Sequence, residues 1–284
     1  MQNQTILVLQ GPQGNDRDLA YLADLARSKN AHLSVVHIGP VQPIPVYAYG
    51  GMPYGAVEVP HKWVHDRQDL AAALEEKRQR SNRFFEKEAI SGEAGVICSF
   101  PASLDDDIAP RTMLCDIAVL QNDLRAEEEA YRKLLYGILF KSPVAVVINP
   151  HASAAPLTPR NVFVAWNASA PAARAVHQAL PMLKAAEQVT IATFDAVRKD
   201  TADGEEPGAD VAKWLSHHRC PVTVRQYQTE GGELGAAIMK QAKDTGADLI
   251  VMGAYGHTRL RQAVFGGTTR TMTEQQDMAV LLAH

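Results

Sequence analysis

The chain repeats one short pattern, and this repeat limits the folds that it can adopt. Cys-Asp-Ile-Ala-Val-Leu occupies residues 115–120, and Ala-Asp-Leu-Ile-Val-Met follows 132 residues later, at 247–252. Each is a short apolar run next to turn residues, which is typical of a buried parallel strand. In both halves these runs belong to a series in which strands alternate with amphipathic helices. The alternation predicts an α/β fold with parallel strands and right-handed crossovers, present twice.

The length of the chain agrees with two domains. Its 284 residues are twice the size of an ordinary domain of about 150 residues. We place the domains at residues 1–150 and 151–284, joined by residues 149–160, whose Pro, Ala and Ser content is typical of a linker. The first domain contains an insertion at residues 40–60 with five prolines and three tyrosines. We interpret this insertion as an extended loop packed on the surface.

Small residues cluster after the second copy of the strand. They are Gly253, Gly256, Gly266, Gly267, Thr268 and Thr269. Glycine permits positive φ and lets a ligand approach the main chain, so we expect a loop whose amides face an anion. A helix beginning near Thr268 would add the positive end of its dipole. The alternative is that these glycines only cap a strand and a helix, because the spacing matches neither the dinucleotide fingerprint nor the P-loop.

Composition argues against several other classes of protein. A net charge of −4 and a pI near 6.2 argue against nucleic acid and anionic membranes as partners. No apolar run approaches the ~20 residues that span a bilayer, and the start lacks the features of a signal peptide, so we expect a cytoplasmic protein. The three cysteines are scattered and are expected to be small apolar residues. His61 and His65 lie four apart without a third ligand nearby, so we predict no metal site there.

The residues at 247–269 and 164–169 resemble the universal stress protein family in its tandem two-domain form. The similarity rests on Ala-Asp-Leu-Ile-Val-Met-Gly at 247–253, on the spacing of the glycines that follow, and on Val-Ala-Trp-Asn-Ala-Ser at 164–169. In the first half it extends only to the order of elements and the strand at 116–120. The resemblance implies two Rossmann-like domains, each with a five-stranded parallel sheet flanked by helices, arranged as a pseudo-dimer. It also implies that the closing strands, at 144–148 and 278–282, pair within one chain.

The resemblance further implies a ligand, because many family members bind ATP at the carboxyl edge of the sheet. We therefore expect ATP, alone or with Mg²⁺, in the C-terminal domain only. The expected contacts are Ala165, Trp166, Asn167, Phe194 and Met252, with Thr193 beside Phe194, for adenosine, and Gly253, Gly256, His257, Gly266, Gly267, Thr268 and Thr269 for the phosphates. Two positions depart from the family: Gly267 replaces a usual Ser or Thr, and Asn167 replaces a frequent Asp. Loss of one hydroxyl donor should weaken binding roughly tenfold.

The first half is expected to hold no nucleotide. Residues 121–124 stand where the glycine pair would be, and Glu127, Glu128 and Glu129 follow where the phosphates would lie. Three carboxylates would repel a polyphosphate. They also complement the N-terminus of a helix, which explains them without a ligand.

These features predict a stress-response regulatory protein whose partner is an adenine nucleotide. The alternative is a nucleotide-free structural or interaction scaffold that acts through dimerisation, with a second copy or another protein as its partner. Catalysis finds little support, because no nucleophile elbow, zinc-protease motif or catalytic acid pair is present in the sequence. Slow ATP hydrolysis would rest on His257 and the neighbouring arginines alone.

Overall fold

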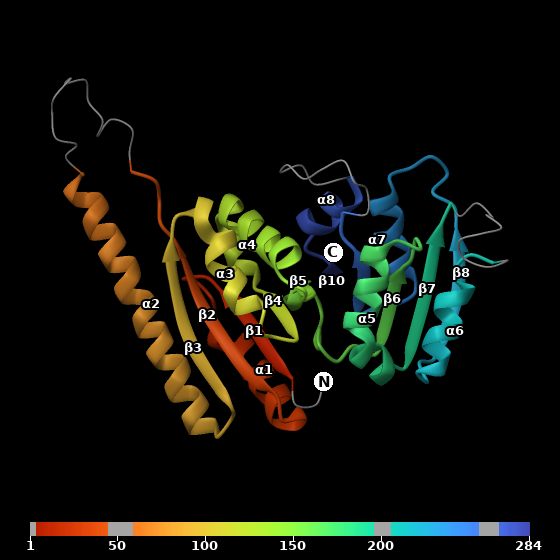
Figure 1. Cartoon of the computed structure of the whole chain (residues 1–284), viewed down its shortest axis with the longest axis horizontal. Helices are drawn as coiled ribbons and strands as arrows, with labels where there is room; N and C mark the ends of the chain where they lie inside the picture. Colours follow the sequence, from red (N-terminus) through yellow and green to blue (C-terminus); the bar gives the residue numbers. More distant parts are fainter. Residues whose placement is uncertain (1–3, 45–58, 196–205, 256–266) are drawn as a thin grey trace. The chain divides into compact units, whose positions relative to one another are not determined.

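A computed structural model describes residues 4–44, 59–195, 206–255 and 267–284, apart from the side chains of residues 16–18. Strands and helices alternate along the chain (Figure 1), which confirms the predicted α/β fold. The strands are β1 (Thr5–Gln10), β2 (His32–Pro40), β3 (Gly92–Ser99), β4 (Ile117–Leu120), β5 (Val146–Ile148), β6 (Asn161–Ala165), β7 (Gln188–Phe194), β8 (Val222–Tyr227), β9 (Leu249–Gly253) and β10 (Ala279–Ala283). The α-helices are α1 (Asp16–Lys29), α2 (His61–Glu88), α3 (Leu104–Thr112), α4 (Glu128–Lys141), α5 (Ala170–Ala185), α6 (Ala209–His217), α7 (Leu234–Asp244) and α8 (Gly267–Glu274).

The chain divides into two compact units. One contains Gln2–Asp116 and Asp123–Lys141, and we call it the β1–β3 unit. The other contains Ile117–Asn122 and Ser142–His284, and we call it the β4–β10 unit. Among the described residues, no helix has both the length and the apolar character needed to cross a membrane. The long helix α2 is strongly charged, and its His61 and His65 are exposed.

In the β1–β3 unit, β2 lies between β1 and β3, and both pairings are parallel. Helix α2 runs along β3 (Figure 1) and contributes the fully buried side chains of Leu74 and Phe85 to the core. Gly39 of β2 permits this close packing, because a Cβ there would lie 2.3 Å from Cδ1 of Leu74. The 45–58 part of the predicted insertion lies outside the described residues.

Helices α3 and α4 of the same unit meet through a buried ion pair. Asp105 is only 6% exposed, and its carboxylate oxygens lie 2.7 Å from Nζ of Lys141 and 3.6 Å from Nζ of Lys133. Burial would raise the pKa of Asp105, but the hydrogen bond from Lys141 and the two positive charges outweigh it, so the pKa lies below its usual 3.8. The carboxylate is therefore ionised in the folded protein at neutral pH.

We expect Asp105→Asn to lower the free energy of unfolding at pH 7 by about 1.5–3 kcal/mol, because a hydrogen bond to a charged group is lost. A carboxyl with a lowered pKa contributes its stabilisation above the unfolded pKa and loses it as the pH falls through the folded pKa. The difference in free energy of unfolding between the variant and the wild type should therefore shrink below about pH 4. Urea denaturation at pH 7 and pH 3 measures both effects. Asp107→Asn, exposed in the same turn, is the control, and a deficit that stays the same at pH 3 would contradict the assignment.

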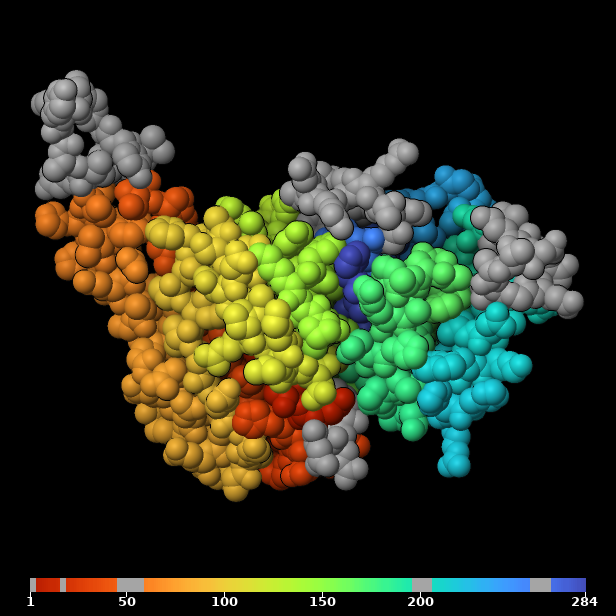
Figure 2. Space-filling view, viewed as in Figure 1, coloured from red at the N-terminus to blue at the C-terminus, as the bar shows by residue number. Residues whose placement is uncertain are grey.

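The β4–β10 unit contains the strand order β4-β5-β10-β9-β6-β7-β8. Every neighbouring pair in this order is parallel except β5 and β10, which run antiparallel with Val147 opposite Leu281. The predicted pairing of the closing strands is therefore confirmed. Helices α5 and α6 are visible together on the face of this unit that Figure 2 shows, in green and cyan.

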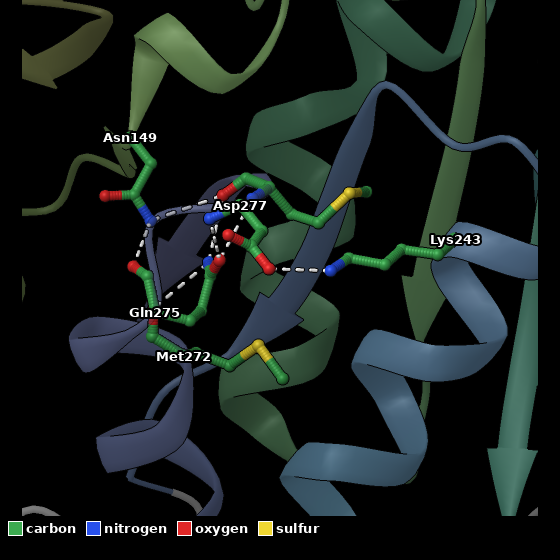
Figure 3. A network of polar contacts seen from close by, with 6 residues as sticks. Asn149, Lys243, Met272, Gln275 and Asp277 are labelled. Carbon is green, nitrogen blue, oxygen red and sulfur yellow. Dashed lines mark hydrogen bonds and ion pairs between the residues drawn. The ribbon is translucent and has the colours of Figure 1, made fainter.

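Residues after β5 pack into this unit rather than forming a loose connection. Asn149 is fully buried, and its Nδ2 donates to the carbonyl oxygens of Gln275, at 2.8 Å, and Met278, at 3.2 Å. The amide oxygen of Gln275 accepts from the backbone N–H groups of Asp277 and Met278, which gives the network in Figure 3. Asp277 also bonds Lys243 of α7 at 2.6 Å. The linker predicted at 149–160 is thus anchored at its first residue.

We expect Asn149→Ala to lower the free energy of unfolding by about 2–4 kcal/mol. The variant leaves two carbonyl groups without this donor, and it forces alanine into a φ of 52°. Asn149→Gly loses the same donor but accepts the positive φ, so its deficit should be smaller than that of the alanine variant. Chemical denaturation of the three proteins checks this order. A glycine variant as stable as the wild type would show that the network in Figure 3 contributes nothing.

Candidate functional site

The candidate site lies at the carboxyl ends of β6, β7 and β9, where the strand order reverses. Strand β6 pairs with β9 on one side and β7 on the other, so Ala165 has Met252 and Ala192 as its partners. From β6 the chain continues outward to β7 and β8, whereas β9 and β10 lie on the other side. Ligands of open α/β sheets bind at such reversals, outside the carboxyl ends of the strands. The predicted residues Ala165 and Met252 are thus neighbours at the expected edge.

Two buried polar atoms lie without hydrogen-bond partners at this edge. The N–H of Trp166 donates to the carbonyl of Ala192 at 2.8 Å, which extends the β6/β7 pairing by one residue and sets Trp166 beside Thr193. Nε1 of Trp166 and Oγ1 of Thr193 are both buried, and neither has a partner in the described part of the chain. Buried polar groups normally have partners, so a ligand atom that reached this pair would supply what the fold does not. Unpartnered side-chain atoms also occur at the matching edge of the first half, on Gln121, Asn122 and Asp123.

Aromatic rings gather on the opposite face of the same strands. Phe194 is half-buried and stacks on Tyr227 with a centroid separation of 5.4 Å, and Phe163 lies 6.5 Å from Phe194. Alternation along β7 places Thr193 and Phe194 on different faces. The structure therefore separates these two predicted neighbours, which had been expected to close together on one base.

Beside these rings, hydrogen bonds join the residues that follow β7 and β8. Asp195 follows β7 with a φ of 47°, and its carboxylate accepts from the N–H of Thr229 at 2.8 Å and from the Thr229 hydroxyl. These hydrogen bonds, the hydroxyl bond first, hold the pKa of Asp195 below its usual value. Asp195 was not predicted from the sequence, because the aspartate and its partner Thr229 lie 34 residues apart.

Asn167 builds the turn that starts helix α5. Its amide oxygen accepts from the Ser169 hydroxyl at 2.7 Å, and the Ser169 oxygen in turn accepts from the N–H of Ala172 as the helix N-cap. Asn167 itself is exposed. Its amide oxygen is therefore engaged locally, and its Nδ2 is the part of the side chain available to a ligand.

Gly253 has a packing role in addition to any ligand role. A Cβ at this position would lie 2.4 Å from the backbone nitrogen of Ala172 and 2.6 Å from the carbonyl carbon of Pro171. The first turn of α5 thus rests directly on the end of β9. Only a residue without a side chain permits this approach.

We expect Gly253→Ala to lower the free energy of unfolding by about 1–3 kcal/mol, because backbone atoms of α5 must move to admit the methyl group. Gly267→Ala is a matched control, since among the described residues the nearest atom to its Cβ would be Oε1 of Glu233, 3.9 Å away. The control should change stability by no more than about 0.5 kcal/mol. Thermal unfolding of both variants checks the contrast, and a Gly253→Ala protein as stable as the wild type would refute the close packing.

The start of α8 holds three further predicted contacts. Gly267 is exposed, Thr268 is half-buried and Thr269 is buried. The Thr269 hydroxyl accepts from the N–H of Tyr255 at 3.4 Å, so one of the two predicted hydroxyl donors already faces the protein. The N–H of Ala254 donates to the carbonyl of Ala283. Gly256, His257 and Gly266 lie outside the described residues.

A carboxylate lies beside this same helix start. Oε1 of Glu233, the residue before α7, is 2.7 Å from the Thr271 hydroxyl and 3.9 Å from the Cβ position of Gly267. Glu233 was not predicted from the sequence, because it lies 34 residues before Gly267 in the chain. The Gly-Gly-Glu run at 231–233 is the one local signal that could have drawn attention to it.

The corresponding place in the first half is filled by side chains. The carboxylate of Asp123 accepts from the N–H of Gly11, after β1, at 3.1 Å, and Leu124 is buried. Glu128 and Glu129 lie exposed in the first turn of α4, as expected, and Glu127 accepts from Gln42. A carboxylate of the protein itself thus lies at the end of β1. In the second half the equivalent strand is β6, and Trp166 and Asn167 follow it.

Comparison with known proteins finds a family model that matches the second half. The model of the universal stress protein family matches residues 159–284. A universal stress protein from Archaeoglobus fulgidus DSM 4304 has 15% identity and a TM-score of 0.68, covering 100% of this chain and 99% of its own. A functionally unknown protein from Pseudomonas aeruginosa PAO1 has 15% identity and a TM-score of 0.55, covering 99% and 92%. Such identities show the fold alone. Among curated proteins, none matches the chain in sequence.

Proposed function

We propose that this chain, whose residues 159–284 match the model of the universal stress protein family, is a regulatory protein that binds an adenine nucleotide through its second half alone. The fold extends over both halves, as the full-length structural match shows, whereas the candidate site belongs to the β4–β10 unit. Binding rather than catalysis is proposed because the sequence contains no nucleophile elbow, zinc-protease motif or catalytic acid pair. Occupancy of the site would then be the signal that partners of the protein recognise.

The observation that carries this proposal is the pair of unpartnered polar atoms at the edge of the sheet. Thr193 is only 3% exposed, and a buried hydroxyl without a partner costs free energy. An indole N–H donates and a hydroxyl both donates and accepts, so the pair suits the mixed donors and acceptors of a nucleobase edge or a ribose. A ligand that supplied the missing partners would recover that cost.

The first half supports the restriction to one site. The Asp123 carboxylate already accepts from the N–H of Gly11, and three glutamates follow at 127–129. A phosphate brought to this place would meet negative charge and an amide that is already bonded. These contacts favour a structural role for the first half.

A nucleotide-free scaffold is the second candidate, and the Glu233 carboxylate favours it. This group lies beside the start of α8, where the proposal requires phosphates. In that case the two halves would serve as a surface for a second copy or another protein. Mass spectrometry of small molecules released from freshly purified, denatured protein separates the two candidates. Release of an adenine nucleotide supports the first candidate. No released nucleotide, together with no calorimetric response to ATP with or without Mg²⁺, supports the second.

We expect Thr193→Val to weaken adenine nucleotide binding roughly tenfold while leaving the free energy of unfolding unchanged or higher, because the variant removes a buried hydroxyl that has no protein partner. Thr190→Val, buried on the same strand but away from its carboxyl end, is the matched control and should leave affinity unchanged. Isothermal titration calorimetry and chemical denaturation measure the two effects. Equal affinities of the Thr193 variant and the wild type would remove Thr193 from the site.

A further inference from the structure

The N-termini of α7 and α8 are packed so closely that a side chain from one reaches the other. A Cβ at Gly235, the second residue of α7, would lie 2.6 Å from Cβ of Thr271 in α8. This approach places Glu233, immediately before α7, against the first turns of α8. Its Oε1 lies 2.7 Å from the Thr271 hydroxyl, which also lies 3.0 Å from the carbonyl oxygen of Gly267.

The Glu233 carboxylate changes the charge at this end of α8. The start of a helix attracts anions because its first N–H groups and its dipole are positive. Here a fixed negative charge lies 3.9 Å from the Cβ position of Gly267, so the attraction is already partly satisfied from within the protein. Arg270 does not compensate, because its guanidinium is bonded to Glu274 at 2.7 Å.

The carboxyl ends of β6 and β7 differ in character. Trp166 and Thr193 present polar atoms without partners and carry no charge. The ends of these strands thus lack partners for a neutral polar group, while the start of α8 already holds an anion. A ligand that reached both places would match them best with a neutral heterocycle and few negative charges.

We infer that Glu233 determines the ligand class of this site by disfavouring a triphosphate relative to the uncharged nucleoside. The inference rests on the proposed function, since it concerns the same site. Like charges at short range repel, and the effect acts on the phosphates of a ligand but not on its nucleoside part. The carboxylate therefore lowers affinity for ATP and leaves affinity for adenosine unchanged.

The test compares Glu233→Gln with the wild type by calorimetric titration of ATP and of adenosine, each with and without Mg²⁺. The amide keeps an oxygen for the Thr271 hydroxyl and removes only the charge. Glu233 is exposed, so its repulsion of phosphates is screened by solvent and salt. We expect ATP binding without Mg²⁺ to tighten roughly two- to fivefold and adenosine binding to stay unchanged. Glu230→Gln, an exposed carboxylate three residues earlier, is the matched control and should change neither affinity. Thermal unfolding confirms that both variants are folded.

The outcomes separate this inference from the proposed function. If adenosine binds but ATP affinity is the same in Glu233→Gln and the wild type, the inference fails and the proposed function stands. If Glu233→Gln weakens ATP binding in the presence of Mg²⁺, the carboxylate holds a cation and the inference is overturned. If neither protein binds adenosine or ATP, both the proposed function and the inference fall.

Discussion

The position of β6 between β7 and β9 is the constraint on which the candidate site depends. Parallel pairing on both sides fixes the register, so that Ala165 lies between Met252 and Ala192 and all three strands end at one edge. Right-handed crossovers then bring the starts of α5 and α6 over the same face. Trp166 and Thr193 become neighbours through this pairing alone, although 27 positions separate them in the chain.

Several residues at this edge have structural roles that compete with ligand binding. Gly253 admits the first turn of α5, Thr269 accepts from Tyr255, and the amide oxygen of Asn167 orders the turn before α5. A glycine or threonine at the end of a strand therefore does not by itself indicate a phosphate. Atoms that the fold leaves without partners are the stronger evidence, and at this edge they belong to Trp166, Thr193 and Tyr227.

Much of the fold followed from the sequence because local rules agree with one another in this chain. The apolar runs within 115–120 and 247–252 each identify one strand, and both strands, β4 and β9, form where they were expected. The pairing of the closing strands was also predicted, although its basis was a family resemblance rather than periodicity. By contrast, the 149–160 segment has a composition typical of a linker, yet its first residue, Asn149, is buried by partners 126 and 129 residues away. Contacts at such separations, including those of Glu233 and Asp123, leave no local pattern.

The pairing of β5 with β10 has a consequence for how the two halves evolve. Because both strands belong to one polypeptide, their association does not weaken on dilution and does not require identical sequences on the two sides. The sequence of each half can then change without disrupting a symmetric interface. The aspartate and glutamates that fill the end of β1 and the start of α4 are the kind of change that such freedom permits.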